Sequence, residues 1–257
     1  MHISALGYVW YYFWIGPHLL LSVVAVLMFR RGLHRQFVAF FSYCIWETVF
    51  FPILFVLAHM QSIDAATYQL VSRTCLVGDM CLRFAIVYEI FAALLQPYPS
   101  LRHASRSLFR WTAAGLVLTG VALAAYQHGL NQTPGTAAIT ILDRSVSLVQ
   151  CGLLVFILVF SSYFHLSWKN FVVGLAFGLG VFASVDLASF TVLSQVEHVT
   201  RRVEPVSDFV NMGAYHCAVL VWLGYLLAPM PVQQPSIAIP RNDLDAWDHE
   251  LERLLQR

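Results

Sequence analysis

The sequence predicts an all-α membrane protein, a polytopic bundle of about seven transmembrane helices followed by a short cytoplasmic helix. Hydrophobic residues make up 59% of the 257 positions and charged residues only 11%, whereas soluble domains carry about 25% charged residues. The apolar residues gather in long windows, and the basic residues gather in alternate loops. Because a chain of this composition cannot hide its apolar surface from water, we expect a bilayer around it.

A helix needs about 20 apolar residues to cross the hydrocarbon core of a membrane. Windows of this kind fill the first 228 residues, which we interpret as the bundle, 1–228. We predict helices over 6–29, 37–58, 69–95, 108–126, 139–164, 171–193 and 206–228. The window 69–95 is the least hydrophobic because it contains four charged residues: Arg73, Asp79, Arg83 and Glu89. We therefore expect this helix to face other helices rather than lipid.

The basic residues of the loops predict how the chain is oriented, because cytoplasmic loops retain Lys and Arg. The loops on one side of the membrane contain Arg30, Arg31, Arg35, Arg102, Arg106, Arg110 and Lys169. The loops on the other side contain only Arg201 and Arg202. This asymmetry predicts an N-terminus outside the cytoplasm and a C-terminus inside it.

The sequence changes character after the last window. Prolines predict a stiff linker over 229–240. The segment 241–257 then repeats large apolar residues at helical spacing: Leu244, Trp247, Leu251, Leu254 and Leu255. The rest of this amphipathic helix is mainly acidic, whereas helices that lie on membranes usually carry a basic face. We therefore expect it to dock on this protein's own cytoplasmic face or on a partner, with lipid as the alternative.

Charged residues within the predicted spans are candidates for function, because each costs a few kcal/mol or more in the membrane. Glu47 lies near the middle of the helix 37–58. Arg83 lies near the middle of the helix 69–95, one helical turn after Asp79. If these helices pack side by side, the three residues form one cluster at mid-membrane. The cluster is either a salt bridge that locks two helices or a proton, ion or ligand site.

Two histidines form a second candidate. His18 and His216 lie at similar depth in the first and last predicted helices, which are commonly neighbours in a closed bundle. Facing imidazoles could ligate haem or a metal ion, and the alternative is hydrogen bonding to Tyr or backbone. The remaining charges of the spans, Asp143, Arg144 and Asp186, are predicted to form ion pairs nearer the outer surface.

Small residues and prolines predict how some of the helices pack. Gly174, Gly178 and Gly180 give the helix 171–193 a face that allows close approach of another helix, within the bundle or in a partner. Pro17 and Pro52 are expected to kink the first two helices, and these kinks could open a cavity between them.

This sequence lacks residues that several classes of protein need for their function. The only lysine is Lys169, which excludes both a retinal Schiff base in the last helix and a basic groove for nucleic acid. Leu220 stands where a helix-seven HxxxH zinc site after His216 would need a histidine. No P-loop, GxSxG or HExxH occurs, and the five cysteines form no metal-ligand spacing. We expect no metal site and no nucleic-acid partner. The sequence does not indicate whether the protein binds another cofactor.

Several short segments of the sequence are similar to those of a known family. They are VYEIF at 87–91, LFRW at 108–111, LDRS at 142–145, VQCGLL at 149–154, LSW at 166–168 and GLAFG at 174–178. In these segments the chain resembles a family of uncharacterised bacterial seven-helix membrane proteins that has no assigned activity. The resemblance implies location in the bacterial plasma membrane and a seven-helix bundle, and it implies no catalytic or binding residue.

These observations favour a non-enzymatic role, as a sensor or an assembly subunit. Its bundle would bind a lipidic ligand or a membrane partner, and its tail helix would engage a cytoplasmic protein. The alternative is a proton or ion transporter or a redox carrier built on Glu47, Asp79, Arg83, His18 and His216. A third hypothesis is a membrane-embedded enzyme that modifies lipids.

Overall fold

The computed structural model describes residues 5–60, 64–94, 136–160, 171–195 and 200–228, together with isolated helical positions at Ser107, Trp111, Ala114, Gly115 and Leu118. Within these residues it contains six long α-helices, one short 3-10 helix and no strand. The elements are α1 (Ala5–Arg30), η1 (Leu33–Arg35), α2 (Val38–His59), α3 (Ala65–Leu94), α5 (Thr136–Phe160), α6 (Phe171–Gln195) and α7 (Thr200–Leu227). The predicted all-α fold is confirmed over this part of the chain.

Four of the described helices are long and apolar enough to cross a membrane. Their apolar segments are Tyr8–Arg30, Val38–His59, Phe171–Val192 and Val206–Leu227. Each segment has 22 or 23 residues, close to the length that the hydrocarbon core requires. Helices α3 and α5, which carry charged residues along their length, are not among the four. The chain is therefore a multi-pass membrane protein.

Six of the seven predicted windows fall on described helices. The window 108–126, apart from its isolated positions, the linker 229–240 and the helix 241–257 with its apolar stripe lie outside the described residues. The apolar segment Val206–Leu227 matches the predicted window 206–228. The helix itself begins at Thr200, so the prediction that Arg201 and Arg202 lie in a loop is wrong: they lie in the first turn of α7. Hydropathy marks where a helix becomes apolar, and the helix itself can begin earlier.

Local signals explain where several helices begin and end. Gly32, directly after the last turn of α1, has a φ of 70°, a left-handed conformation that glycine adopts without strain. Asp64 precedes α3, and its Oδ1 accepts a hydrogen bond of 2.9 Å from a first-turn amide. Helix α2 is capped from another helix: the Glu89 carboxylate accepts bonds of 3.0 and 3.1 Å from the amides of Ala39 and Phe40. This places a negative charge at the positive end of α2.

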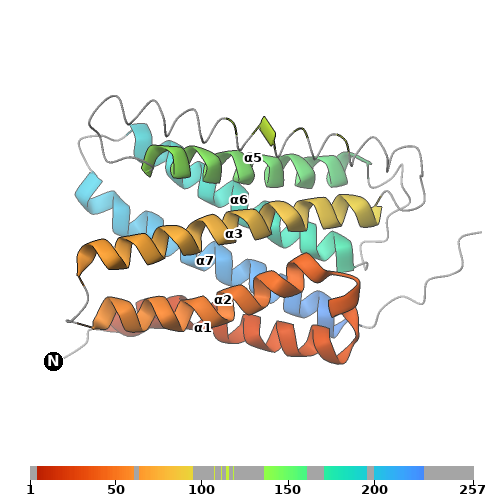
Figure 1. The fold of residues 1–257 in the computed structure, drawn as a ribbon, viewed down its shortest axis with the longest axis horizontal. Coiled ribbons are helices and arrows are strands. Elements are labelled where there is room, and N and C mark those ends of the chain that lie inside the picture. Colours follow the sequence, from red (N-terminus) through yellow and green to blue (C-terminus); the bar gives the residue numbers. More distant parts are fainter. Residues whose placement is uncertain are drawn as a thin grey trace, which may run out of the picture.

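The described helices lie side by side along the long axis of the molecule (Figure 1). Contacts join α1 to α2, α2 to α3, α3 to α5, α5 to α6, α6 to α7, and α7 back to α1. These six helices therefore form a closed ring, and α3 also contacts α6 across it. The expectation that the first and last helices are neighbours is confirmed.

Apolar packing is densest in the half of the bundle that contains η1, and we call this part the packed half. Its fully buried side chains include Leu21, Met28, Phe40, Ile90, Leu175 and Trp222. Glycines allow the close approach of helices here. A methyl group at Gly178 would overlap the indole of Trp222, one at Gly174 would overlap the ring of Tyr225, and one at Gly180 would overlap Leu154. The glycine face of α6 is therefore covered by α7 and α5 of the same chain.

Candidate functional site

A cavity of about 280 Å³ lies between the helices above the packed half. Its charged or ionisable lining residues include His18, Glu47, Asp79, Arg83, Asp143 and Asp186. The other lining residues are Tyr43, Leu76, Phe182 and Tyr215. Each of the six described helices contributes at least one of these side chains. The cavity is therefore the place where the polar groups of the bundle converge.

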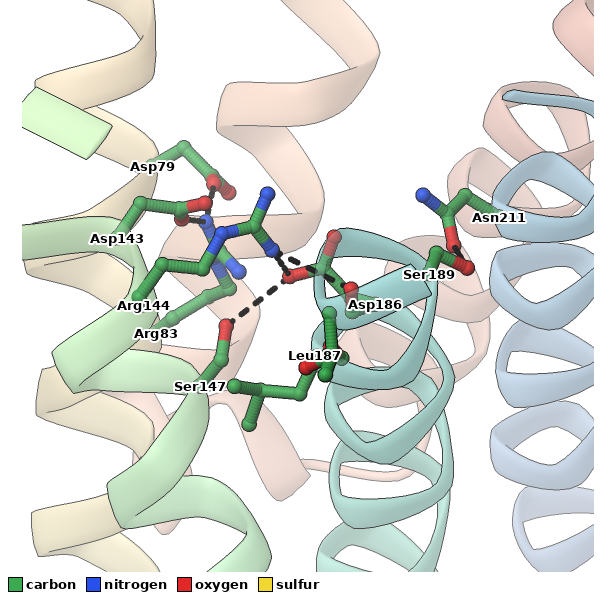
Figure 2. Close-up of polar contacts among 10 residues, drawn as sticks. Asp79, Arg83, Asp143, Arg144, Ser147, Asp186, Leu187, Ser189 and Asn211 are labelled. Carbon is green, nitrogen blue, oxygen red and sulfur yellow. Dashed lines mark hydrogen bonds and ion pairs between the residues drawn. The ribbon is translucent and has the colours of Figure 1, made fainter. Parts of the chain in front are cut away.

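Arg83 is the central cation of the site. It is 5% exposed, and its Nη2 atom lies 2.8 Å from Asp79 Oδ2 and 2.5 Å from Asp143 Oδ1 (Figure 2). Asp79 is one turn earlier on the same helix, whereas Asp143 comes from α5. A single guanidinium nitrogen is thus shared by two carboxylates from two helices, and the buried positive charge is compensated on both sides.

A second ion pair joins α5 to α6 beside the first. Arg144 Nη1 lies 2.5 Å from Asp186 Oδ2, and Ser147 donates a hydrogen bond of 3.3 Å to the same oxygen (Figure 2). The Arg144 guanidinium also lies 4.3 Å from the ring centre of Phe190, a cation–π distance. Two adjacent residues of α5 thus point to different neighbours, because successive helical positions are about 100° apart.

The third polar contact joins α1 to α2. His18 Nδ1 lies 2.9 Å from the carbonyl oxygen of Trp14, and since a carbonyl can only accept, Nδ1 carries the proton. The other nitrogen, Nε2, lies 3.5 Å from Glu47 Oε2. The imidazole also stacks on Phe51, with ring centres 3.9 Å apart. His18 therefore connects the backbone of its own helix to the Glu47 carboxyl group of α2.

Gly78 brings α2 and α3 close together beside the cavity. It precedes Asp79, and a methyl group at this position would overlap the indole of Trp46, which precedes Glu47. The carboxyl groups of Glu47 and Asp79, from these two helices, both line the cavity.

Aromatic side chains complete the lining. The Tyr43 hydroxyl lies 3.3 Å from that of Tyr215, which connects α2 to α7. Phe182 of α6 packs edge-to-face on Tyr215, with ring centres 5.5 Å apart. The cavity therefore combines carboxylates with aromatic rings at mid-bundle.

The structure brings most of the predicted candidates into this one site. Glu47, Asp79 and Arg83 line the cavity together, and His18 joins them. His216 is not a lining residue: it lies beside Tyr12, whose hydroxyl is 3.4 Å from His216 Nε2. No described contact joins the two histidines.

Sequence reasoning missed part of the site. The predicted ion pairs are confirmed, since Arg144 pairs with Asp186 and Asp143 pairs with Arg83, but the partner of Asp143 was not predicted. A signal was present in α5, where Asp143, Ser147 and Gln150 recur at helical spacing on one face of an otherwise apolar helix.

The described residues do not fit haem or metal ligation. Both ring nitrogens of His18 already face groups of the protein. In the part of the chain that the structure describes, no group of three or more His, Cys, Asp or Glu side chains is arranged to hold a metal ion. Ligation by His18 and His216 together therefore has no support in this geometry.

Comparison with other proteins gives no relative. No protein-family model, no curated protein and no solved structure matches this chain. Its function is therefore argued from its own residues.

Proposed function

We propose that this protein is a non-enzymatic membrane sensor whose helix bundle binds a small polar ligand in the cavity. The observation that carries the proposal is that every described helix contributes a lining side chain. A ligand in the cavity would contact all of these helices, so its binding can favour one arrangement of the bundle over another. The charged lining favours a polar ligand over the lipidic ligand that composition alone suggests.

A purely structural role accounts for less of the geometry. Ion pairs that only lock helices would be expected to satisfy their own hydrogen-bond donors. Here the buried Arg83 leaves its Nε atom without a partner among the described residues, and the three polar contacts surround a cavity rather than close upon each other. Room for a further polar molecule therefore remains beside the ion pairs.

The sequence-based features complete the proposal. The chain would cross the bacterial plasma membrane seven times, N-terminus outside, with 108–126 as the remaining helix. The tail helix 241–257 would dock on a cytoplasmic protein and transmit the occupancy of the cavity. Reporter domains fused to the two ends test the orientation, since a C-terminal phosphatase that is active only outside the cytoplasm should stay inactive.

Native mass spectrometry of the protein, gently extracted from its own membranes, tests for a bound ligand. Leu76 lines the cavity, so Leu76→Phe should fill it and remove a small-molecule mass that wild type carries. Leu70→Phe is the matched control, because Leu70 lies on the same helix and is 69% exposed. Wild type without any small-molecule mass, or Leu76→Phe with the wild-type mass, would contradict the proposal. An additional polypeptide would identify the partner of the tail.

A second candidate function is a proton path. It is favoured by the contact of His18 with Glu47 and by the nearness of Glu47 to Asp79, because proton relays use such neighbouring titratable groups. A pH-sensitive dye inside proteoliposomes measures it. Proton flux in wild type that Glu47→Gln abolishes would favour transport, and equal, background flux in both would leave the sensor as the function.

A further inference from the structure

The carboxyl groups around the cavity outnumber their positively charged partners. Arg144 pairs with Asp186, and His18 Nε2 lies 3.5 Å from Glu47. The remaining group contains two carboxyl groups, those of Asp79 and Asp143, but one guanidinium, that of Arg83. The site therefore holds one carboxyl group more than it has guanidinium or imidazole partners.

A net negative charge inside a membrane bundle attracts one positive charge. Uncompensated charge is costly where the surroundings are apolar, and Tyr43 of the lining is itself part of the buried apolar core. A cationic ligand beside the surplus carboxylate would balance the charge of the site.

The rest of the lining favours an organic cation over a metal ion. Among the described residues no three side chains are arranged as metal ligands, whereas Tyr43, Tyr215 and Phe182 present aromatic rings to the same space as Glu47 and Asp79. Aromatic faces together with a carboxylate are a common environment for ammonium groups. A volume of about 280 Å³ accommodates a molecule of a few heavy atoms rather than a lipid.

We propose that the cavity binds the ammonium group of a small primary amine between the carboxyl groups of Glu47 and Asp79, with Tyr215 and Phe182 against its carbon chain. This names the ligand class of the proposed sensor and rests on that function. The three N–H donors of a primary ammonium match the carboxylate oxygens, and the chain of the amine lies along the rings.

Three molecules of matched size and different charge test the proposal: n-pentylamine, n-pentanol and pentanoate. The measurement is isothermal titration of each into the full-length protein in detergent. The amine should bind to wild type, and the alcohol and the carboxylate should not. Equal heats from the amine and the alcohol would overturn the inference, because the site would then respond to the apolar chain alone.

Asp79→Asn supplies the matched variant. It removes the surplus charge while Asp143 still pairs with Arg83, so the fold should be retained and amine binding should weaken about tenfold or more. Asp208→Asn, on an exposed position of α7 outside the lining, should bind the amine as wild type does. Unchanged binding in Asp79→Asn would overturn the inference.

The pH dependence provides a readout that simple packing would not give. The charged and titratable groups that face the site are His18 from α1, Tyr43 and Glu47 from α2, Asp79 and Arg83 from α3, Asp143 and Arg144 from α5, Asp186 from α6 and Tyr215 from α7. Because protonation of the carboxyl groups removes the negative charge that attracts the ammonium group, amine affinity should rise as the pH is raised. A flat profile would contradict binding between ionised carboxyl groups.

The outcomes separate this inference from the proposed function. If native mass spectrometry finds a small molecule that Leu76→Phe removes, but the amine does not bind, the sensor proposal stands and the ligand class is wrong. If no small molecule is found and the amine does not bind, both the sensor proposal and the ligand class are wrong.

Discussion

The two halves of the bundle hold their helices together in different ways. In the packed half, apolar side chains such as Phe40 and Trp222 interlock, and Gly178 lets two helices approach closely. In the other half, which we call the polar half, the helices meet through the Arg83 and Arg144 ion pairs around a cavity. Packing is insensitive to protons and ligands, whereas balanced charges respond to both. Both halves therefore hold the helices together, but only the polar half is expected to respond to a bound charge.

The largest effect is expected from the central cation. Arg83→Met leaves Asp79 and Asp143 facing each other without a positive charge, which should lower the free energy of unfolding by about 3–5 kcal/mol. Chemical unfolding in detergent, followed by circular dichroism, measures this change. Arg73→Met is the control on the same helix: Arg73 forms no ion pair among the described residues, and a change within about 0.5 kcal/mol is expected. Equal losses in the two variants would break the comparison.

The packed half should respond to added volume. Gly178→Ala places a methyl group against the Trp222 indole and should cost about 1–3 kcal/mol, because a close-packed interface must shift. Gly152→Ala is the matched control on α5, where a methyl group meets nothing within 4 Å. It should be neutral or stabilise by up to about 1 kcal/mol through helix propensity. The same unfolding experiment compares the two variants. A higher free energy of unfolding for Gly178→Ala would show that the interface of α6 and α7 accommodates the methyl group without strain.

Two carboxylates of the polar half should respond differently to the same substitution. Asp186→Asn leaves the Arg144 guanidinium without its carboxylate and should cost about 1–3 kcal/mol. Asp79→Asn leaves Arg83 paired with Asp143 and removes a surplus charge, so its unfolding free energy should stay within about 0.5 kcal/mol of wild type or exceed it. Thermal unfolding of the two proteins side by side measures this difference. A larger loss for Asp79→Asn would mean that the site has no surplus negative charge.

The smallest effect is expected where the carboxylate only caps a helix. Glu89→Gln removes the negative charge at the start of α2 and should cost about 0.5–1 kcal/mol, with faster amide hydrogen exchange confined to the first turn of that helix. Asp64→Ala is the counterpart and should loosen the start of α3 instead. Faster exchange at Asp79 or Glu47 in either variant would show that the caps and the cavity are coupled.

The sequence was sufficient where the interactions are local. The Asp79 and Arg83 ion pair follows from their spacing of one helical turn, and the structure contains it. Glu47 could be placed near them because charged residues in apolar helices turn toward other helices. Six of the predicted windows fall on described helices, although α3 and α7 begin several residues earlier, at Ala65 and Thr200.

The remaining site residues depend on contacts between helices that no local pattern encodes. Asp143 pairs with Arg83 from 60 positions further along the chain, and Arg144 pairs with Asp186 across 42 positions. Gly78 could not be recognised as a close contact because its partner, Trp46, lies on another helix. Such pairings depend on how each helix is rotated about its own axis, and one sequence does not specify that rotation.

The sequence by itself determined that this chain is a helical membrane protein and that α2 and α3 carry buried charges, since composition and short spacing control both properties. The tertiary structure decided that these charges, His18 and two aspartates from α5 and α6 surround one cavity with aromatic walls. The physical reason is that the cost of a buried charge is local, whereas its compensation comes from whichever helix packs beside it.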